Sequence, residues 1–299
     1  MKQGVLLLAH GAPERGEDVE SYLTFVRGGR PASARIVEEV ASRYQAIGGS
    51  SPLLAWTRVQ AEALERLLDI PVFFGMRNWH PFIRETMERV REAGLDRIAA
   101  IAMAPQYSEL SVGLYIRRTE EARLAAGVTA EILWARSFHD EPLLVEAFAE
   151  KLEPLAAGRK VLLTAHSLPE KALAGGNDPY DRETRATAAA VAARLGLADW
   201  EFAYQSQGLT EDRWLGPPVE SCLDRYAAEG IREVVVYPIG FVCDHVETLF
   251  DVDVVFREYG AARGISVIRP EALNGSPKFT AALAEVAKRS LRAANVRER

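Results

Sequence analysis

Residues 4–15 read GVLLLAHGAPER, and residues 160–171 read KVLLTAHSLPEK. Each stretch is an apolar run that ends in Ala-His, followed by a small residue, a proline and a charged pair. Buried strands of parallel sheets have this apolar pattern, and ligands of open α/β sheets bind at the carboxyl edge, where such strands end. The repeat therefore predicts two similar α/β halves facing one cleft, with His10 and His166 at the edges of their sheets.

A second pair of segments supports this duplication. Residues 97–105 read RIAAIAMAP and residues 232–238 read REVVVYP, so both are apolar runs that stop at a proline. Proline cannot donate to a strand ladder, so we expect Pro105 and Pro238 to end their strands.

Apolar runs and amphipathic segments alternate along the chain, which is typical of parallel sheets with helical crossovers. We predict strands near 4–10, 71–76, 97–105, 129–134, 160–165, 200–206, 232–238 and 265–269, with helices at 33–47, 56–68, 82–93, 182–195 and 219–229. The expected fold is α/β, with two Rossmann-like domains that each hold a four-stranded parallel sheet flanked by helices. We place these domains at 1–140 and 141–299, and the last helical pattern, about 277–292, could pack back on the first.

Residues 11–52 depart from this alternation, because they contain two helical patterns and two glycine-rich loops but no strand. An insertion of this length after the first strand is more typical of a binding surface than of a core. It carries basic and hydroxyl groups, and arginine can bind both oxygens of a carboxylate. The candidate ligand-binding residues in it are Arg27, Arg43, Tyr44 and Ser51, with Arg30 across the Gly-Gly turn from Arg27.

Composition excludes several classes of protein. The net charge of −6 argues against a general nucleic-acid binder, and no apolar run has the length of a transmembrane helix. The two cysteines, Cys222 and Cys243, are too few for a four-thiolate iron–sulfur or zinc site. We expect a cytoplasmic monomer with free thiols and no organic cofactor.

His166 has a candidate partner in residues 238–251, PIGFVCDHVETLFD. A helical pattern that begins near Asp244 would place Glu247 early on the helix and Asp251 on the same face. In that helix His245 would point away from Glu247. A carboxylate near a neutral imidazole can form a divalent-metal site or a proton-transfer pair.

These segments resemble the signature blocks of ferrochelatases. The similar blocks are EDVESYL, RGGRP, YQAIGGSSP, TAHSLPEK, YQSQG followed by WLGP, PIGFVCDHVETLFD and LNGSPKF, and they extend from residue 4 to about 290. The resemblance implies two Rossmann-like halves around a porphyrin cleft, insertion of ferrous iron as a substrate, and a haem-type product. It implies catalytic and metal-binding roles for His166 and Glu247, and porphyrin contacts for Arg27, Arg43, Tyr44, Ser51 and Tyr115.

Two departures from the family pattern bear on metal binding. Asp251 matches one member of an acidic ladder proposed for metal delivery or a second metal site, but the next ladder position is Val255, which cannot ligate a hard cation. Soluble bacterial members commonly have Tyr-Gly-Thr-Pro after the first strand, whereas this chain has His10-Gly11-Ala12-Pro13. Because imidazole is a good ligand for ferrous iron, we hypothesise that His10 is the axial ligand of the product.

The resemblance leaves the substrate open. The soluble type takes coproporphyrin III, which the arginine-rich insertion favours over protoporphyrin IX. Small chelatases that load cobalt or iron into sirohydrochlorin share the fold and carry a similar Ala-His-Gly block. A porphyrin or haem carrier, which would need the cleft but not the base, is the non-enzyme alternative.

Overall fold

The structure, a computed structural model, describes residues 1–208 and 212–297, with side chains up to Arg292. The chain forms two compact units. Unit 1 consists of Met1–Pro105, Glu109–Phe138 and Gly275–Arg299, and unit 2 consists of Gln106–Ser108 and His139–Asn274. The division into 1–140 and 141–299 remains a prediction. Among the described helices, none combines the length and the apolar character that crossing a membrane would require.

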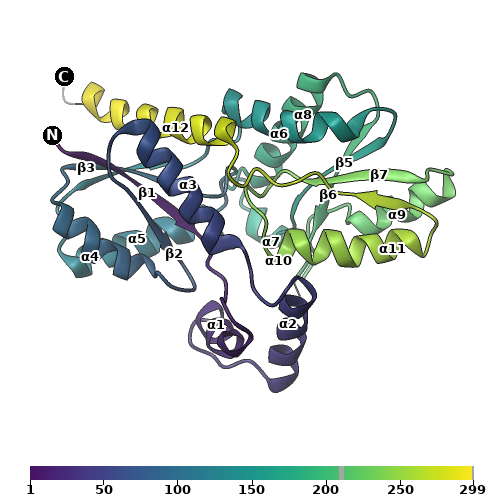
Figure 1. Cartoon of the computed structure of the whole chain (residues 1–299), viewed down its shortest axis with the longest axis horizontal. Helices are drawn as coiled ribbons and strands as arrows, with labels where there is room; N and C mark the ends of the chain where they lie inside the picture. Colours follow the sequence, from purple (N-terminus) through teal and green to yellow (C-terminus); the bar gives the residue numbers. More distant parts are fainter. Residues whose placement is uncertain (209–211, 298–299) are drawn as a thin grey trace. The chain divides into compact units, whose positions relative to one another are not determined.

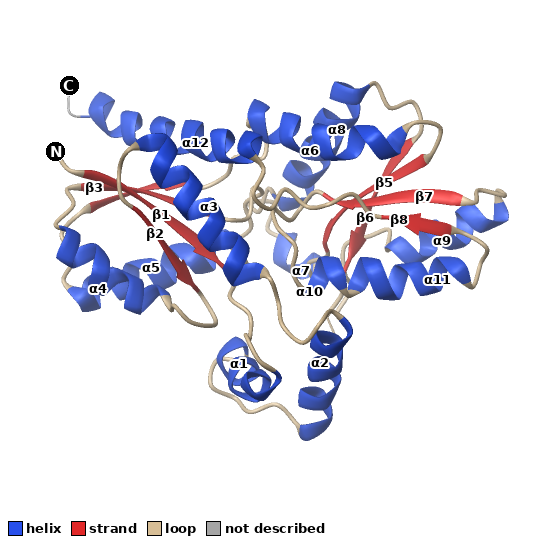
Figure 2. Ribbon diagram, in the orientation of Figure 1, coloured by secondary structure: helices blue, strands red, loops and turns tan. Residues whose placement is uncertain are grey.

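Unit 1 is built on a four-stranded parallel sheet in the order β2-β1-β3-β4 (Figure 1). Its strands are β1 (Gln3–Ala9), β2 (Val72–Met76), β3 (Arg97–Ala102) and β4 (Glu131–Ala135). Helices α3 (Leu53–Leu68) and α12 (Pro277–Arg297) pack together on one face, and α4 (Ile83–Ala93) and α5 (Val112–Ala126) pack together against the other (Figure 2). Because both faces are covered, the run Leu6–Leu8 is fully buried, as its continuous apolar pattern predicts.

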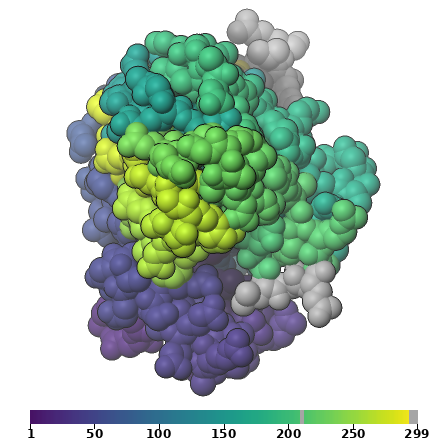
Figure 3. Space-filling model, turned by 90° about the vertical axis from the view of Figure 1, so that its right-hand side faces the viewer, coloured from purple at the N-terminus to yellow at the C-terminus, as the bar shows by residue number. Residues whose placement is uncertain are grey.

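Unit 2 repeats this topology, with the strand order β6-β5-β7-β8 and all pairs parallel. Its strands are β5 (Lys160–His166), β6 (Trp200–Gln205), β7 (Glu233–Pro238) and β8 (Ser266–Ile268). Helices α6 (Pro142–Ala156) and α8 (Tyr180–Leu195) cover one face, and α9 (Val219–Ala228) and α11 (Arg257–Ala261) cover the other. The segment of the chain that holds the second pair, coloured green to yellow-green, lies on the face shown in Figure 3. The expected fold class is confirmed.

The insertion after β1 contains the short helix η1 (Gly16–Asp18), α1 (Val19–Val26) and α2 (Ala34–Ala46), which pack against one another. Gly28 and Gly29 connect α1 to the next segment with φ angles of +66° and +88°. Glycine adopts this left-handed region without the steric cost that a Cβ imposes, so the Gly-Gly pair allows the turn between Arg27 and Arg30.

Three short helices complete unit 2: α7 (Glu170–Leu173), α10 (Val246–Leu249) and the π-helix η2 (Asp251–Phe256). The elements differ from the prediction mainly at their ends. Strand β7 ends at Pro238 as expected, but β3 ends at Ala102 rather than at Pro105. After Ala102 the backbone no longer pairs as part of the sheet, and the Pro105 carbonyl oxygen accepts a hydrogen bond from the Phe138 amide at 2.9 Å.

Two leucines of α3 provide a matched test of the unit 1 core. Leu64 is fully buried, whereas the side chain of Leu67 is 54% exposed. Leu64→Ala should lower the free energy of unfolding by about 2–5 kcal/mol because it removes buried methyl groups and leaves a cavity. Leu67→Ala, with the same change in helix propensity, should lower it by less than about 0.5 kcal/mol. Urea unfolding followed by circular dichroism measures both, and equal effects would contradict this account of the core.

Candidate functional site

The carboxyl ends of β5, β6 and β7 bring polar side chains together in unit 2. His166 ends β5 and Gln205 ends β6, and the segment after β7 carries His245 and Glu247. Gly240 allows the β7 end to lie close to β5, because a Cβ at this position would be only 2.9 Å from the Ala165 Cβ. The predicted position of His166 at the sheet edge therefore matches the structure.

His166 lies beside Glu247, with 3.7 Å between its Nε2 and the Glu247 Oε1. Its Nδ1 is bonded to the Ser167 carbonyl oxygen. A carbonyl oxygen can only accept a hydrogen bond, so Nδ1 carries a proton, and in the neutral ring the lone pair is on Nε2, the nitrogen beside Glu247. The side chains of His166 and Glu247 are 31% and 36% exposed, so both can be reached by a ligand.

Tyr180 fixes the backbone at this point, because its hydroxyl donates to the His166 carbonyl oxygen at 2.8 Å. Burial, with the nearby Tyr204 and Glu247, raises the pKa of Tyr180 well above its usual value. The phenol therefore stays protonated and keeps its role as a donor at neutral pH.

His245 also faces Glu247, so the expectation that it points away is wrong. Its backbone is extended, with φ −160° and ψ −174°, because α10 begins only at the next residue, Val246. The His245 Nε2 is 3.6 Å from the Glu247 Oε2, and its Nδ1 is 3.1 Å from the Cys243 carbonyl oxygen. Each carboxylate oxygen of Glu247 therefore has an imidazole Nε2 beside it.

A reciprocal pair of hydrogen bonds at the start of α10 holds His245 in this orientation. The Thr248 Oγ1 accepts a hydrogen bond from the His245 amide at 3.0 Å and donates to the His245 carbonyl oxygen at 2.9 Å. Thr248 stands three residues after His245, which is the spacing of a capping box. The pair marks His245 as the residue before the helix rather than part of it.

Two buried polar residues that sequence reasoning missed hold the backbone of Glu247. The Gln205 side-chain amide donates to the Glu247 carbonyl oxygen at 2.9 Å and accepts from the Thr164 hydroxyl at 2.6 Å. Both residues are at most 1% exposed. The only sequence signal for these two residues is that each is a polar residue within an apolar run, Thr164 in VLLTAH and Gln205 in FAYQS.

Asp251 begins the π-helix η2, so the α-helical spacing used to place it on one face with Glu247 ends before it. Its Oδ2 accepts a hydrogen bond from the Ser206 hydroxyl. Val255 packs against the hydrophobic core of unit 2. Within the described residues, no three His, Cys, Asp or Glu side chains converge as a preformed metal site.

The two cysteines are buried free thiols. Burial, together with the charge of Asp244, raises the pKa of Cys243 to about 12, and burial raises the pKa of Cys222. Because the thiolate is the form that ligates metals, and both thiols stay protonated at neutral pH, neither cysteine is in the form that binds a metal.

His10 follows the last residue of β1 in unit 1 and is exposed. Its Nδ1 lies 3.0 Å from the Gly11 carbonyl oxygen, and the Asn78 amide nitrogen lies 3.1 Å from its Nε2. The carbonyl assigns the proton to Nδ1, so Nε2 accepts from Asn78 in the neutral ring. Metal binding through Nε2 would replace that hydrogen bond.

The other predicted ligand contacts of unit 1 differ in accessibility. Arg27 is exposed at the end of α1, whereas Arg43 is ion-paired with Glu39 at 2.6 Å. The Ser51 hydroxyl accepts from the Leu53 amide at the start of α3. Tyr44 and Tyr115 are buried, and Tyr115 lies under the guanidinium of Arg77 at 4.8 Å. Their roles toward a ligand remain predictions.

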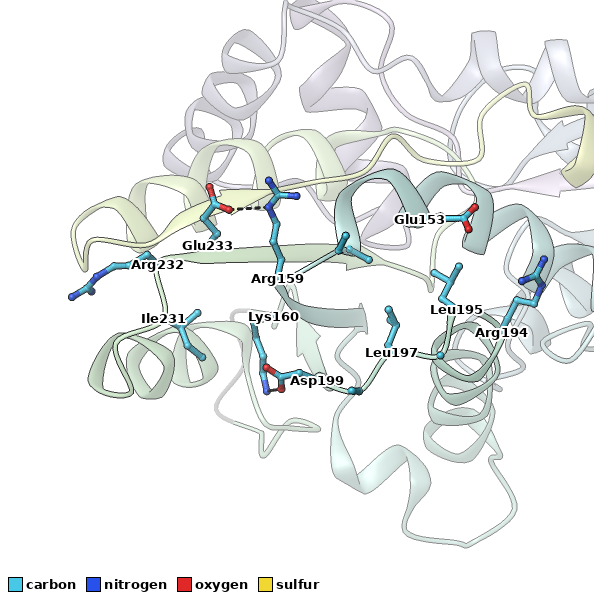
Figure 4. Close-up of a pocket in the computed structure, with 15 residues that line it drawn as sticks. Glu153, Arg159, Lys160, Arg194, Leu195, Leu197, Asp199, Ile231, Arg232 and Glu233 are labelled. Carbon is cyan, nitrogen blue, oxygen red and sulfur yellow. Dashed lines mark hydrogen bonds and ion pairs between the residues drawn. The ribbon is translucent and has the colours of Figure 1, made fainter.

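A cavity of about 1070 Å³ lies at the opposite end of the unit 2 sheet from His166. It is lined by the turns before β5, β6 and β7, and Figure 4 shows the ion pair between Arg159 and Glu233 at its wall. Lys160, at the start of β5, is paired with Asp199 there. The imidazoles and Glu247 are at the other edge of the sheet, so this cavity is separate from the candidate site.

Comparisons with known proteins agree with the resemblance of the motifs. The family model described as Ferrochelatase matches residues 2–291. A ferrochelatase of Acidobacterium capsulatum is 42% identical, with 97% of this chain and 95% of that protein covered. A coproporphyrin III ferrochelatase of a Geobacillus species is 35% identical, with 95% and 96% covered.

Solved structures with this fold include SirB from Bacillus subtilis with Fe³⁺, which has a TM-score of 0.64 and 13% identity. This likeness covers 97% of this chain and 96% of SirB. CbiX, described as the terminal enzyme for biosynthesis of sirohaem in denitrifying bacteria, has a TM-score of 0.51 and 16% identity, with 96% of this chain and 99% of CbiX covered. At these identities the likeness is one of fold alone.

Proposed function

Because this chain belongs to the ferrochelatase family, and is therefore a metal chelatase of haem biosynthesis, we propose that its porphyrin substrate is coproporphyrin III. We further propose that His166 and Glu247 remove the pyrrole protons as ferrous iron enters. The observation that carries the second proposal is the position of the His166 Nε2, 3.7 Å from the Glu247 carboxylate, while its Nδ1 is bonded to the Ser167 carbonyl oxygen.

The reaction exchanges two protons of the porphyrin for one ferrous ion. A free-base porphyrin has two pyrrole N–H groups, and both protons must leave before four nitrogens can bind the metal. His166 accepts a proton at Nε2, and the adjacent carboxylate of Glu247 stabilises the imidazolium or takes the proton onward. Before the protons leave, the same lone pairs can hold iron while it loses water.

Binding the macrocycle in a bent form would expose the nitrogen lone pairs to the metal. A site that binds the bent ring more tightly than the flat ring lowers the barrier, because the bent ring resembles the transition state. Arg27, Arg43, Tyr44, Ser51 and Tyr115 are the proposed contacts that fix the position of the ring and its carboxylates.

Coproporphyrin III is favoured by charge and by the relatives. It has four propionates, and the exposed Arg27 and Arg30 on either side of the Gly28-Gly29 turn can bind carboxylates. Several relatives at 34–35% identity are named coproporphyrin III ferrochelatases. Others, at 37–42% identity, are named ferrochelatases with no porphyrin specified, so protoporphyrin IX is the alternative substrate.

Anaerobic metallation followed by visible absorption tests the substrate. Purified protein and ferrous iron are offered coproporphyrin III, protoporphyrin IX and sirohydrochlorin in parallel, and coproporphyrin III should give the highest kcat/KM. Preference for protoporphyrin IX would overturn the proposed substrate but leave iron insertion intact. Turnover of sirohydrochlorin alone, or porphyrin binding without any turnover, would contradict the proposal as a whole.

His166→Ala should abolish metallation while the circular dichroism spectrum and the porphyrin Kd stay close to the wild type. Glu247→Gln keeps the shape of the side chain but removes its charge, so kcat should fall by about 10²–10⁴-fold, the range for loss of an acid–base group. The matched control is Glu229→Gln, on an exposed carboxylate at the end of α9, which should not change kcat. Wild-type turnover in His166→Ala would show that another group is the base.

The proposed axial ligation by His10 has a spectroscopic test. If the imidazole ligates the product iron, His10→Ala should shift the absorption bands of the bound ferrous product, and added imidazole should restore them. His80→Ala is the control, because His80 is exposed and paired with Glu85. An unchanged spectrum in His10→Ala would rule out this ligation.

A further inference from the structure

A largely buried arginine, Arg269, is hydrogen-bonded to the residue that precedes His245. Arg269 follows the last residue of β8, and its side chain is only 9% exposed. Its Nη1 donates to the Asp244 Oδ1 at 2.7 Å, while Nε and Nη2 donate to the Asp253 Oδ2 at 3.0 and 2.7 Å. One guanidinium thus joins β8, the residue before His245, and the π-helix η2.

Asn274 closes the other side of this network. Its side-chain amide donates to the Asp244 Oδ2 at 2.8 Å, and its side-chain oxygen accepts from the Asp244 backbone amide at 2.8 Å. Each carboxylate oxygen of Asp244 therefore has a buried donor, and its backbone is held as well. This arrangement fixes the rotation of the residue that directly precedes His245.

The network also reaches the residue after Glu247. The Thr248 hydroxyl, which caps α10 through His245, lies 3.4 Å from the Asp244 Oδ1. The residues on both sides of the His245–Glu247 segment, Asp244 and Thr248, are therefore connected through the Asp244 carboxylate, which accepts a hydrogen bond from Arg269. The Gln205 amide is the second support, because it bonds the Glu247 carbonyl oxygen from β6.

A gain in folding stability does not by itself explain why the charges of Arg269, Asp244 and Asp253 are shielded from water. Removing charged groups from water costs several kcal/mol for each ion, and apolar replacements for buried ion pairs are often neutral or stabilising. Burial by itself would lower the pKa of Arg269, but the hydrogen bonds and charges of Asp253 and Asp244 outweigh it and raise the pKa. The guanidinium is therefore permanently charged, and its planar fork can serve two carboxylates in fixed directions.

We infer that Arg269 is a positioning residue for metallation, which keeps the Glu247 carboxylate between the Nε2 atoms of His166 and His245 by holding Asp244 and Asp253. This inference rests on the proposed roles of His166 and Glu247. The hydrogen bonds of Arg269 to Asp244 and Asp253 lie within unit 2, and Arg269 acts through the backbone of residues 244–248 rather than on the porphyrin. Outer groups of this kind typically change activity by about 10–100-fold when they are removed.

The test compares Arg269→Met and Arg269→Lys with the wild type, using ferrous iron and coproporphyrin III. Arg269→Met should lower kcat by about 10–100-fold with little change in the porphyrin KM. Arg269→Lys keeps the charge but cannot reach both carboxylates with the same fork, so its kcat should be intermediate. Arg263→Met is the matched control, because it breaks another arginine–aspartate pair of unit 2, with Asp224, and should leave kcat unchanged.

A double-mutant comparison separates positioning from a general loss of structure. If Arg269 acts through Glu247, Arg269→Met should lower the residual kcat of Glu247→Gln by less than about threefold, because the effects of coupled residues are not additive. An equal loss in both backgrounds would overturn the inference and assign Arg269 a structural role.

If Arg269→Met does not fold, Asp253→Asn provides a second test, with Arg257→Met as the control for the ion pair that Asp253 also makes with Arg257. Asp253→Asn keeps the side-chain shape but weakens one of the two carboxylate contacts, so kcat should fall with the porphyrin KM unchanged. Wild-type kcat in a folded Arg269→Met or Asp253→Asn protein would refute the positioning role while leaving the proposed function intact. A wild-type protein that metallates none of the porphyrins would instead refute the proposed function.

Discussion

The bond between the Nδ1 of a histidine and a backbone carbonyl oxygen determines what the candidate site can do. The acceptors are Ser167 for His166 and Cys243 for His245. A carbonyl oxygen has no proton to give, so it fixes the ring tautomer without adding charge. In the neutral rings, the two Nε2 lone pairs then lie beside one carboxylate. With the opposite tautomer, each ring would present an N–H at this position and could neither accept a pyrrole proton nor bind iron.

The supports of this arrangement come from different parts of unit 2. Tyr180 of α8 holds the backbone of His166, Gln205 of β6 holds that of Glu247, and Arg269 after β8 holds Asp244. Parallel strands make this convergence possible, because their carboxyl ends lie at one edge of the sheet and the segments that follow them meet there. The site is therefore assembled by topology from residues more than 100 positions apart.

The sequence was sufficient for the fold because its periodic signals are strong. Apolar runs such as VLLTA are buried on both faces, and the prolines and glycines between them mark the ends of the elements. His166 and Glu247 could be singled out because each lies directly after a predicted strand or at the start of a predicted helix. The motifs also identified the family correctly.

The remaining features depend on geometry that local patterns do not encode. The direction of His245 is set by two backbone angles at a single residue, and the helix was expected to start two residues too early. The partners through which Gln205 acts are 41 and 42 residues away in the sequence, and those of Arg269 are 16 and 25 residues away. Charged and polar residues next to strand ends have many possible partners in a sequence, and only the packing of the elements selects among them.

The interleaving of the two units has a consequence for synthesis on the ribosome. Unit 1 requires α12, which begins at Pro277 and packs on α3, β3 and β4, whereas the described part of unit 2 ends at Asn274. A chain that emerges from its N-terminus thus makes the strands of unit 1 first but completes unit 2 first. Until α12 has been synthesised, one face of the unit 1 sheet is only partly covered by helices. Unit 1, whose strands are made first, is therefore the last unit to complete its fold.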